Sequence, residues 1–274
     1  MTKVWFVTGS SRGLGRALVE AALDSGASVI ATARTVESLD AFTQKYGSDR
    51  FLALPVDVSK QSDVVSAVNA SHEKFGRIDV VVNNAGYANT AAVEDVDIQD
   101  FQEQINTNFM GVVYVTKAVL PILREQGSGH IFQVSSVGGR LGTPGLGAYQ
   151  SAKWAVNGFS TVLAREVAPL GIKVTVLEPG GIRTDWAGSS MKTHPISEPY
   201  QPTVGAMAER HHQQSGSEPS LPHKIAGIIV NLAETGDAPL RLLLGPDAVE
   251  HAGKGAEALA ESDRKWQQIS LSSV

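Results

Sequence analysis

The chain has 274 residues, of which 42% are hydrophobic, with a formal net charge of -5 and no cysteine. Without cysteine it forms no disulfides, thiolate nucleophiles, iron-sulfur clusters or thiolate zinc sites, so redox chemistry would need a bound cofactor. The acidic balance gives no basis for nucleic-acid binding, because nucleic-acid binders carry basic patches. The composition is that of a globular protein with a sizeable core.

Short apolar runs alternate with helical patterns along the chain. The runs, which predict about seven strands, lie at 4-7, 27-32, 51-56, 78-82, 130-134, 172-177 and 240-244. The helical patterns lie at 13-25, 36-46, 61-75, 98-125, 148-168, 223-234 and 248-268. Thr35 and Ser59 are candidate N-caps of the second and third helices. Because several runs are apolar on both faces, we expect an α/β fold, a three-layer doubly wound parallel sheet of the Rossmann type with helices on both faces.

We expect one domain over 1-274, with two appended segments. The segment 183-222 is the long irregular stretch, rich in Pro, Ser, Gly and His, and it leaves the sixth strand where such sheets bind ligands. We interpret it as a lid over a substrate cleft, the alternative being a poorly ordered surface insertion. A helical tail at 247-270 would cap or block an interface between subunits.

The first strand-like run begins at Val4, which leaves no room for a signal peptide. No apolar run approaches the roughly 20 residues that span a bilayer. We therefore expect a cytoplasmic protein without membrane contact. His211 and His212 are adjacent and lack a carboxylate cluster around them, so we expect no metal site.

Three glycines follow the first strand and open the first helix. Gly9, Gly13 and Gly15 would allow a tight turn, close approach of the backbone to a pyrophosphate and close packing of the helix on the sheet. The N-terminus of the helix would then face the phosphates. This placement predicts a dinucleotide site.

Tyr149 and Lys153 lie one helical turn apart, and Tyr149 comes thirteen residues after Ser136. A tyrosine titrates near ~10, and lowering its pKa to ~7 takes roughly 4 kcal/mol, which a unit cation at about 4 Å supplies at an effective dielectric near 20. The pair therefore suits transfer of a proton to or from an alcohol oxygen, with Tyr149 as acid in reduction and base in oxidation. Burial opposes this shift of the pKa. Ser136 would donate a hydrogen bond to the same oxygen.

The Gly-xxx-Gly-x-Gly spacing, Asn83-Asn84-Ala85-Gly86, the Tyr149/Lys153 pair and Pro179-Gly180 together resemble the classical short-chain dehydrogenase/reductase family over roughly 3-250. Within it the chain looks most like the hydroxysteroid dehydrogenase-like or retinol dehydrogenase-like branch. The resemblance implies an oxidoreductase that transfers a hydride between a nicotinamide and a ketone, aldehyde or secondary alcohol. It also implies that Asn108 holds a water linking Lys153 to solvent, with Asn106 as the competing candidate.

The resemblance assigns a cofactor role to several groups of residues: Gly9, Ser11, Arg12, Gly13, Leu14 and Gly15; Arg34; Asp57 and Val58; Asn84, Ala85 and Gly86; Tyr149 and Lys153; and Pro179, Gly180, Ile182 and Thr184. Asp57 could equally only close a turn. Family members that prefer NAD carry an acidic residue at the end of the second strand, where this chain has Ala33 followed by Arg34. Two arginines, Arg12 and Arg34, suit a ribose 2'-phosphate, so we predict NADP(H) rather than NAD(H).

Gly138, Leu146 and Trp186 are the candidate substrate contacts, and they predict a largely apolar cleft. The family's subunits pair through helices around 98-125 and 148-168, which implies a homodimer or a homotetramer. Two rival interpretations stay open: an NAD-dependent alcohol dehydrogenase, and a non-enzymatic NADP(H)-binding redox sensor that signals through a partner.

Overall fold

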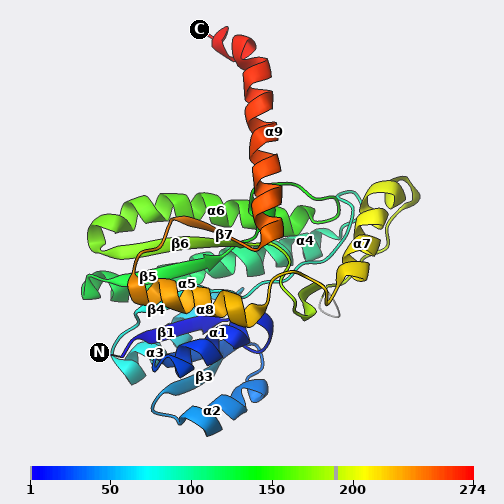
Figure 1. The fold of residues 1–274 in the computed structure, drawn as a ribbon. Helices are drawn as coiled ribbons and strands as arrows, with labels where there is room; N and C mark the ends of the chain where they lie inside the picture. The colour runs from blue at the N-terminus through cyan, green and yellow to red at the C-terminus, as the bar shows by residue number, and fades with distance from the viewer. Residues whose placement is uncertain (1, 188–190) are drawn as a thin grey trace.

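The computed structural model describes residues 2-187 and 191-274. In these residues one parallel seven-stranded sheet has the order β3-β2-β1-β4-β5-β6-β7 (Figure 1). Its strands are β1 (Val4–Thr8), β2 (Ser28–Ala33), β3 (Phe51–Pro55), β4 (Val80–Asn83), β5 (Gly129–Val134), β6 (Ile172–Pro179) and β7 (Arg241–Leu244). The order reverses between β1 and β4, which is the switch point where doubly wound sheets bind ligands. The expected fold class is confirmed.

Two apolar layers cover the two faces of the sheet. One contains side chains of α1 (Gly13–Asp24), α2 (Asp40–Tyr46) and α8 (Pro222–Thr235). The other contains side chains of α3 (Gln61–Phe75), α5 (Gly111–Gln126) and α6 (Gly147–Val167). Neighbouring residues of the central strands point to opposite layers, as Phe6 and Val7 do, which explains why these strands are apolar throughout.

The helix expected over 98-125 is present as a continuous helical stretch, in which a π-helical turn at Asn106–Met110 joins α4 (Ile98–Ile105) to α5. The two expected N-caps were wrong, because α3 begins after Lys60 and the 3-10 turn Glu37–Leu39 begins after Val36, neither with a side-chain cap. Ser59 instead donates both its backbone N-H (3.1 Å) and its hydroxyl (2.7 Å) to Asp57 Oδ1.

The segment expected to be irregular at 183-222 contains helical structure. Short turns at Asp185–Ala187, Glu198–Tyr200 and Gln201–Gly205 precede α7 (Ala206–Gln214). Backbone hydrogen bonds from Thr90 N to Lys192 O (2.8 Å) and from His194 N to Thr90 O (2.9 Å) join the segment to the domain. Residues 188-190 of the expected lid lie outside the described residues.

The C-terminal helix α9 (Pro246–Leu271) projects away from the sheet (Figure 1). Ala248 and Ala252 in its first two turns are buried, whereas Leu259 and Trp266, which continue the same face, are 63% and 53% exposed. The expected tail at 247-270 is thus a helix of which only the beginning packs on the domain.

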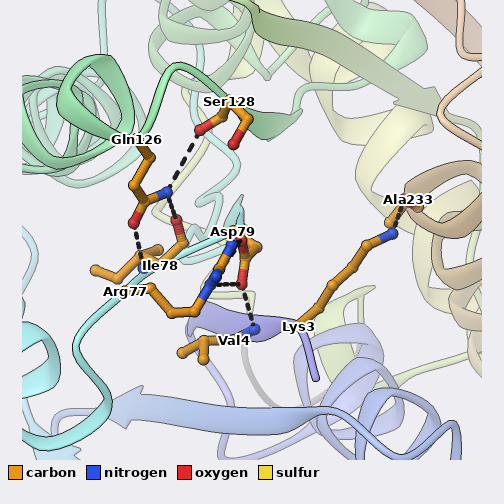
Figure 2. A network of polar contacts seen from close by, with 8 residues as sticks. All are labelled: Lys3, Val4, Arg77, Ile78, Asp79, Gln126, Ser128 and Ala233. Carbon is orange, nitrogen blue, oxygen red and sulfur yellow. Dashed lines mark hydrogen bonds and ion pairs between the residues drawn. The ribbon is translucent and has the colours of Figure 1, made fainter. Parts of the chain in front are cut away.

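A polar network fixes the strands at the edge of the sheet opposite the carboxyl ends (Figure 2). Asp79 accepts a hydrogen bond from Val4 N (2.8 Å) and forms an ion pair with Arg77 (2.5 Å). The side-chain amide of Gln126 pairs with Ile78 by accepting from its N-H (3.0 Å) and donating to its carbonyl (2.7 Å). The network links β1, β4 and the end of α5 before β5 begins.

His130 at the start of β5 makes stability depend on pH. It is buried, its Nε2 lies 2.9 Å from Thr175 Oγ1, and burial lowers its pKa to about 4. Since Thr175 Oγ1 already donates to Pro239 O, Nε2 donates to Thr175, and the lowered pKa keeps the ring neutral at pH 7. The unfolded state therefore binds more protons than the folded state between pH ~6.5 and ~4. The contribution of neutral His130 to the free energy of unfolding is complete above pH ~6.5 and is lost as the pH falls towards ~4.

From this shift we expect the free energy of unfolding to fall by about 2 kcal/mol between pH 7 and pH 5 through His130 alone. Urea unfolding at the two pH values measures the difference. A His130→Gln variant should lose about that much of the pH dependence, and an unchanged dependence would contradict the assignment.

Candidate active site

A cavity of about 1240 Å³ opens at the carboxyl ends of the strands, across the switch point. Most of the residues that the sequence singled out line it: Gly9, Ser11, Arg12, Gly13, Leu14, Arg34, Asp57, Val58, Asn84, Ala85, Gly86, Ser136, Gly138, Leu146, Tyr149, Lys153, Pro179, Gly180, Ile182, Thr184 and Trp186. Parallel strands place these segments at one edge, although they are far apart in the sequence. Gly15 and Asn108 do not line the cavity, but they pack against Gly9 and Gly86, which do.

The glycine loop between β1 and α1 requires glycine for two different reasons. Gly9 and Gly13 have φ angles of 68° and 55°, in the left-handed region that other residues rarely adopt. Gly15 has an ordinary backbone, but a Cβ there would lie 2.2 Å from the Gly9 carbonyl oxygen. The loop thus folds back onto the first turn of α1, as a phosphate-binding turn requires.

Asn84, after β4, holds this loop in place. Its side-chain amide donates to Thr8 O (2.9 Å) and Gly9 O (3.1 Å). In return Thr8 Oγ1 accepts from the backbone N-H groups of Asn84 and Ala85, both at 3.0 Å. The two loops on either side of the switch point therefore form one rigid wall of the cavity.

Two arginines lie at the end of this wall, near β2. Arg12 and Arg34 are both exposed, both line the cavity, and within residues 2-187 and 191-274 neither guanidinium group makes a hydrogen bond or ion pair to a protein group. Arg16, by contrast, is engaged by Ser38 O (2.6 Å) and by the ring of Phe42. The guanidinium groups of Arg12 and Arg34 are available to an anionic ligand.

Asp57 and Val58 follow β3 and border the same end of the cavity. The Asp57 carboxylate accepts the two Ser59 hydrogen bonds, so it does close a turn, the alternative considered above. Val58 packs against Gly111, since a Cβ added to Gly111 would lie 2.9 Å from the Val58 side chain. Both residues are thus held by local contacts while they face the cavity.

Ser136, Tyr149 and Lys153 meet at the other end of the cavity. Ser136 follows β5, and its hydroxyl accepts from Gly138 N (3.0 Å). Tyr149 and Lys153 are buried on α6, with Lys153 Nζ 5.5 Å from the centre of the Tyr149 ring. Lys153 Nζ donates to Val134 O (2.8 Å), which ties α6 to the end of β5.

Burial dominates the protonation of this group. It raises the pKa of Tyr149 to about 12, against a smaller lowering effect of the hydrogen bond with Ser136. It lowers the pKa of Lys153 to about 8. Lys153 alone does not offset this effect, because the same desolvation disfavours the charged forms of both side chains. With its raised pKa, Tyr149 is protonated at neutral pH.

Asn108 lies in the π-helical turn and is completely buried. Its side-chain amide donates to Tyr87 O (2.9 Å) and Gln104 O (2.8 Å), and Tyr87 N donates to its Oδ1 (3.1 Å). A Cβ on Gly86 would lie 2.5 Å from Asn108 Oδ1 and 3.6 Å from Lys153 Nζ, so Gly86, which lines the cavity, packs directly on Asn108. The rival candidate Asn106 lines the cavity directly.

The segment after β6 forms the wall beside Tyr149. Gly181 N donates to Asp247 Oδ2 (2.7 Å), and a Cβ on Gly180 would collide with the same carboxylate. Trp186 packs on Tyr149 with ring centres 5.2 Å apart. Leu146 and Met191 complete this apolar cluster around Tyr149.

Sequence reasoning missed the outer part of the cavity. Its charged lining comes from the segment 183-222 and from α9: Asp185, Lys192, Arg210, His211, Glu218, Asp247, His251 and Lys254. The cleft is apolar around Tyr149 but charged further out, so the expectation of a largely apolar cleft holds only for its inner part. No motif marks these residues, because α7 and α9 reach the cavity only through the tertiary fold.

The geometry defines a class of protein, namely a dinucleotide-binding fold with a serine, a tyrosine and a lysine at one end of its ligand cavity. The model of the short chain dehydrogenase family matches residues 3–195. The chain belongs to the short-chain dehydrogenase/reductase family of oxidoreductases. Among the described residues no group of three or more His, Asp or Glu side chains could hold a metal ion, and no helix is long and apolar enough to cross a membrane.

Relatives extend the likeness to the whole chain. Oxidoreductase BOA17 of Botryotinia fuckeliana is 66% identical over 274 residues, covering 100% of both chains. A solved short-chain dehydrogenase from Streptomyces avermitilis is 35% identical with a TM-score of 0.93, also covering 100% of both chains. An alcohol dehydrogenase from Thermococcus sibiricus, solved with 5-hydroxy-NADP, is 26% identical with a TM-score of 0.74, covering 89% of this chain and 97% of that one. None of these likenesses identifies the hydroxysteroid or retinol dehydrogenase-like branch.

Proposed function

We propose that the protein is an NADP(H)-dependent oxidoreductase that interconverts a ketone or aldehyde and the corresponding alcohol. The observation that carries the proposal is the meeting of Ser136, Tyr149 and Lys153 in a cavity that continues to the glycine loop. The loop fits a dinucleotide, because Gly9 and Gly13 adopt left-handed backbone angles, and the loop packs so closely on the Asn84-Ala85 segment that a Cβ on Gly9 would lie 2.8 Å from Ala85 Cα. When bound, the nicotinamide exchanges a hydride with the substrate carbon.

The protein groups would handle the proton on the substrate oxygen. In reduction, Tyr149 donates its hydroxyl proton to the oxygen while Ser136 stabilises the developing charge by a hydrogen bond. Because burial raises the pKa of Tyr149 to about 12, the phenol is protonated at neutral pH, which favours its role as an acid. Lys153 would bind the ribose hydroxyls and, as a cation, stabilise the phenolate that forms. Lys153 would then return a proton to the Tyr149 phenolate, and Asn108 would hold the water that replaces this proton on Lys153.

The cofactor preference rests on Arg12 and Arg34. They offer two guanidinium groups at the adenosine end of the cavity, and Ala33 supplies no carboxylate there. A ribose 2'-phosphate would satisfy both, because arginine matches phosphate geometry. The Thermococcus enzyme, which was solved with 5-hydroxy-NADP, is compatible with this proposal.

The substrate would place its carbonyl against Tyr149 and an apolar body against Leu146 and Trp186. Gly138, which lines the cavity beside Ser136, would contact that body. The described part of the segment 183-222 would act as the lid, and it brings Trp186 and His211 to the cavity.

Measuring consumption of NADPH and of NADH against a panel of ketones, aldehydes, quinones and steroids tests the proposal. We expect turnover that is faster with NADPH than with NADH on at least one carbonyl class. Tight NADPH binding without turnover would favour the redox sensor instead, and a preference for NADH would favour the NAD-dependent dehydrogenase.

We also propose a homodimer. Trp154 and Val162 lie on one face of α6 and are 51% and 57% exposed, which leaves an apolar strip on a helix that the family uses for pairing. The exposed face of α9 at Leu259 and Trp266 is a second apolar surface that a tetramer could cover.

A further inference from the structure

Glu178 is a carboxylate with no exposed surface, located in β6 directly before Pro179 and Gly180. Its Oε2 accepts hydrogen bonds from Arg140 Nε (2.8 Å) and from Arg140 Nη2. Its Oε1 accepts from Asn157 Nδ2 (2.9 Å), and Arg241 Nη1 lies 3.8 Å from the same oxygen. None of these four residues belongs to the proton-transfer group or lines the cavity.

The partners of Glu178 come from the segments that carry the reacting side chains. Arg140 closes the 3-10 turn Val137–Gly139, which begins directly after Ser136. Asn157 lies on α6, one turn beyond Lys153 and two turns beyond Tyr149. Its Nδ2 also donates to Gly139 O (3.0 Å), so α6 is bonded to the Ser136 turn as well as to Glu178.

Close packing makes this junction rigid. A Cβ on Gly139 would lie 2.7 Å from Asn157 Nδ2, 3.0 Å from Lys153 O and 3.0 Å from Ser135 Oγ. The Ser136 turn therefore lies directly on α6, and its Gly139 N-H donates to Ser136 O (2.9 Å). A shift of the turn would move Ser136 relative to Tyr149.

Within the oxidoreductase function proposed above, we infer that Glu178 is a positioning residue, which joins the Ser136 turn, the Tyr149 helix and the Pro179-Gly180 wall through Arg140 and Asn157. A buried carboxylate keeps its place only with its partners, because an unpaired charge in the interior is strongly unfavourable. Removing the charge releases Arg140, whose side chain is 31% exposed and can turn to solvent, so the turn loses its attachment to β6 and keeps only its contacts with α6. The reacting groups stay present but no longer meet in the correct geometry.

The rival explanation is an ion pair that only stabilises the fold. The chain offers a matched control in Asp79, a carboxylate that is also paired with an arginine and bonded to a backbone N-H, but at the opposite edge of the sheet (Figure 2). Asp79→Asn should lower the melting temperature and leave kcat unchanged. A purely structural Glu178 would behave in the same way.

The experiment compares Glu178→Gln with Asp79→Asn and the unmodified chain. We expect Glu178→Gln to lower kcat by about 10- to 100-fold, the effect of misplacing a reacting group by about 1 Å, with the KM for NADPH changed less than about threefold. Because the Ser136 hydrogen bond lowers the pKa of Tyr149, loosening the turn should also move the rise of alcohol oxidation with pH to higher pH. Arg140→Lys keeps the cation but loses the second N-H, so it should lower kcat by an intermediate factor. This variant replaces Glu178→Gln in the test if Glu178→Gln does not fold.

Two outcomes would overturn the inference: an unchanged kcat in a folded Glu178→Gln protein, or a loss that Asp79→Asn reproduces. A crystal structure of the Glu178→Gln variant tests the positioning role independently of activity, since we expect Ser136 Oγ to move relative to the Tyr149 hydroxyl. An unmoved Ser136 would refute the positioning role. Absence of turnover in the unmodified chain, with Ser136 moved in the variant, would count against the proposed reaction and not against the positioning.

Discussion

Replacing Tyr149 with phenylalanine is expected to lower kcat by about 10²- to 10⁴-fold, the usual contribution of a positioned acid or base. The variant removes only the hydroxyl, while the ring keeps its packing on Trp186 and Leu146. NADPH affinity should change little, because the glycine loop and the two arginines are untouched. Initial rates with saturating NADPH, together with NADPH fluorescence titration, measure the two quantities separately.

Tyr46→Phe is the matched control for this variant. The Tyr46 hydroxyl donates to Asp24 (2.6 Å) on the α1 and α2 side of the sheet, and Tyr46 does not line the cavity. It should keep the full kcat. If Tyr149→Phe also keeps it, Tyr149 is not the acid and the proposed mechanism fails.

The second large effect concerns the cofactor. We expect Arg34→Ala to raise the KM for NADPH by about 10- to 100-fold, as loss of a charge-assisted hydrogen bond does, and to leave the KM for NADH nearly unchanged. The reason is that only NADPH carries the 2'-phosphate. The double variant Arg12→Ala/Arg34→Ala should remove the preference almost completely. Steady-state kinetics with both cofactors against one carbonyl substrate gives the ratio.

Arg16→Ala controls for the loss of an arginine in the same region. Arg16 is occupied by Ser38 O and the Phe42 ring and does not line the cavity, so its loss should cost stability without changing the cofactor ratio. Equal effects of Arg34→Ala on NADPH and NADH would contradict recognition of a 2'-phosphate and favour the NAD-dependent alternative.

Local patterns predicted much of the fold and of the inner site. The strand and helix ranges followed from apolar periodicity, and the glycine loop and the Tyr149/Lys153 pair followed from fixed short spacings that backbone geometry imposes. The errors occurred where short-range signals are weak. Serine is a common N-cap residue, but the backbone N-H and the hydroxyl of Ser59 both donate to the Asp57 carboxylate. The π-helical turn at Asn108 leaves no trace in periodicity, since one added residue hardly changes it.

The pKa of Tyr149 could not be obtained from sequence either. The spacing to Lys153 is local, but burial raises the pKa to about 12, and part of that burial comes from Trp186, which packs on the Tyr149 ring from a distant segment of the chain. Proximity of a cation and exclusion of water oppose each other here, and only the packed structure decides which effect is larger.

The sequence by itself determined the fold class, and it predicted the dinucleotide loop and the groups that we propose transfer the proton, because each depends on residues close together in the chain or on strand ends that parallel pairing must bring to one edge. The tertiary structure alone decided the charged outer wall from α7 and α9, the place of Asn108 behind Gly86, and the junction at Glu178. These features join residues tens of positions apart. Their contacts depend on how helices pack on the sheet, and no spacing in the sequence encodes that packing.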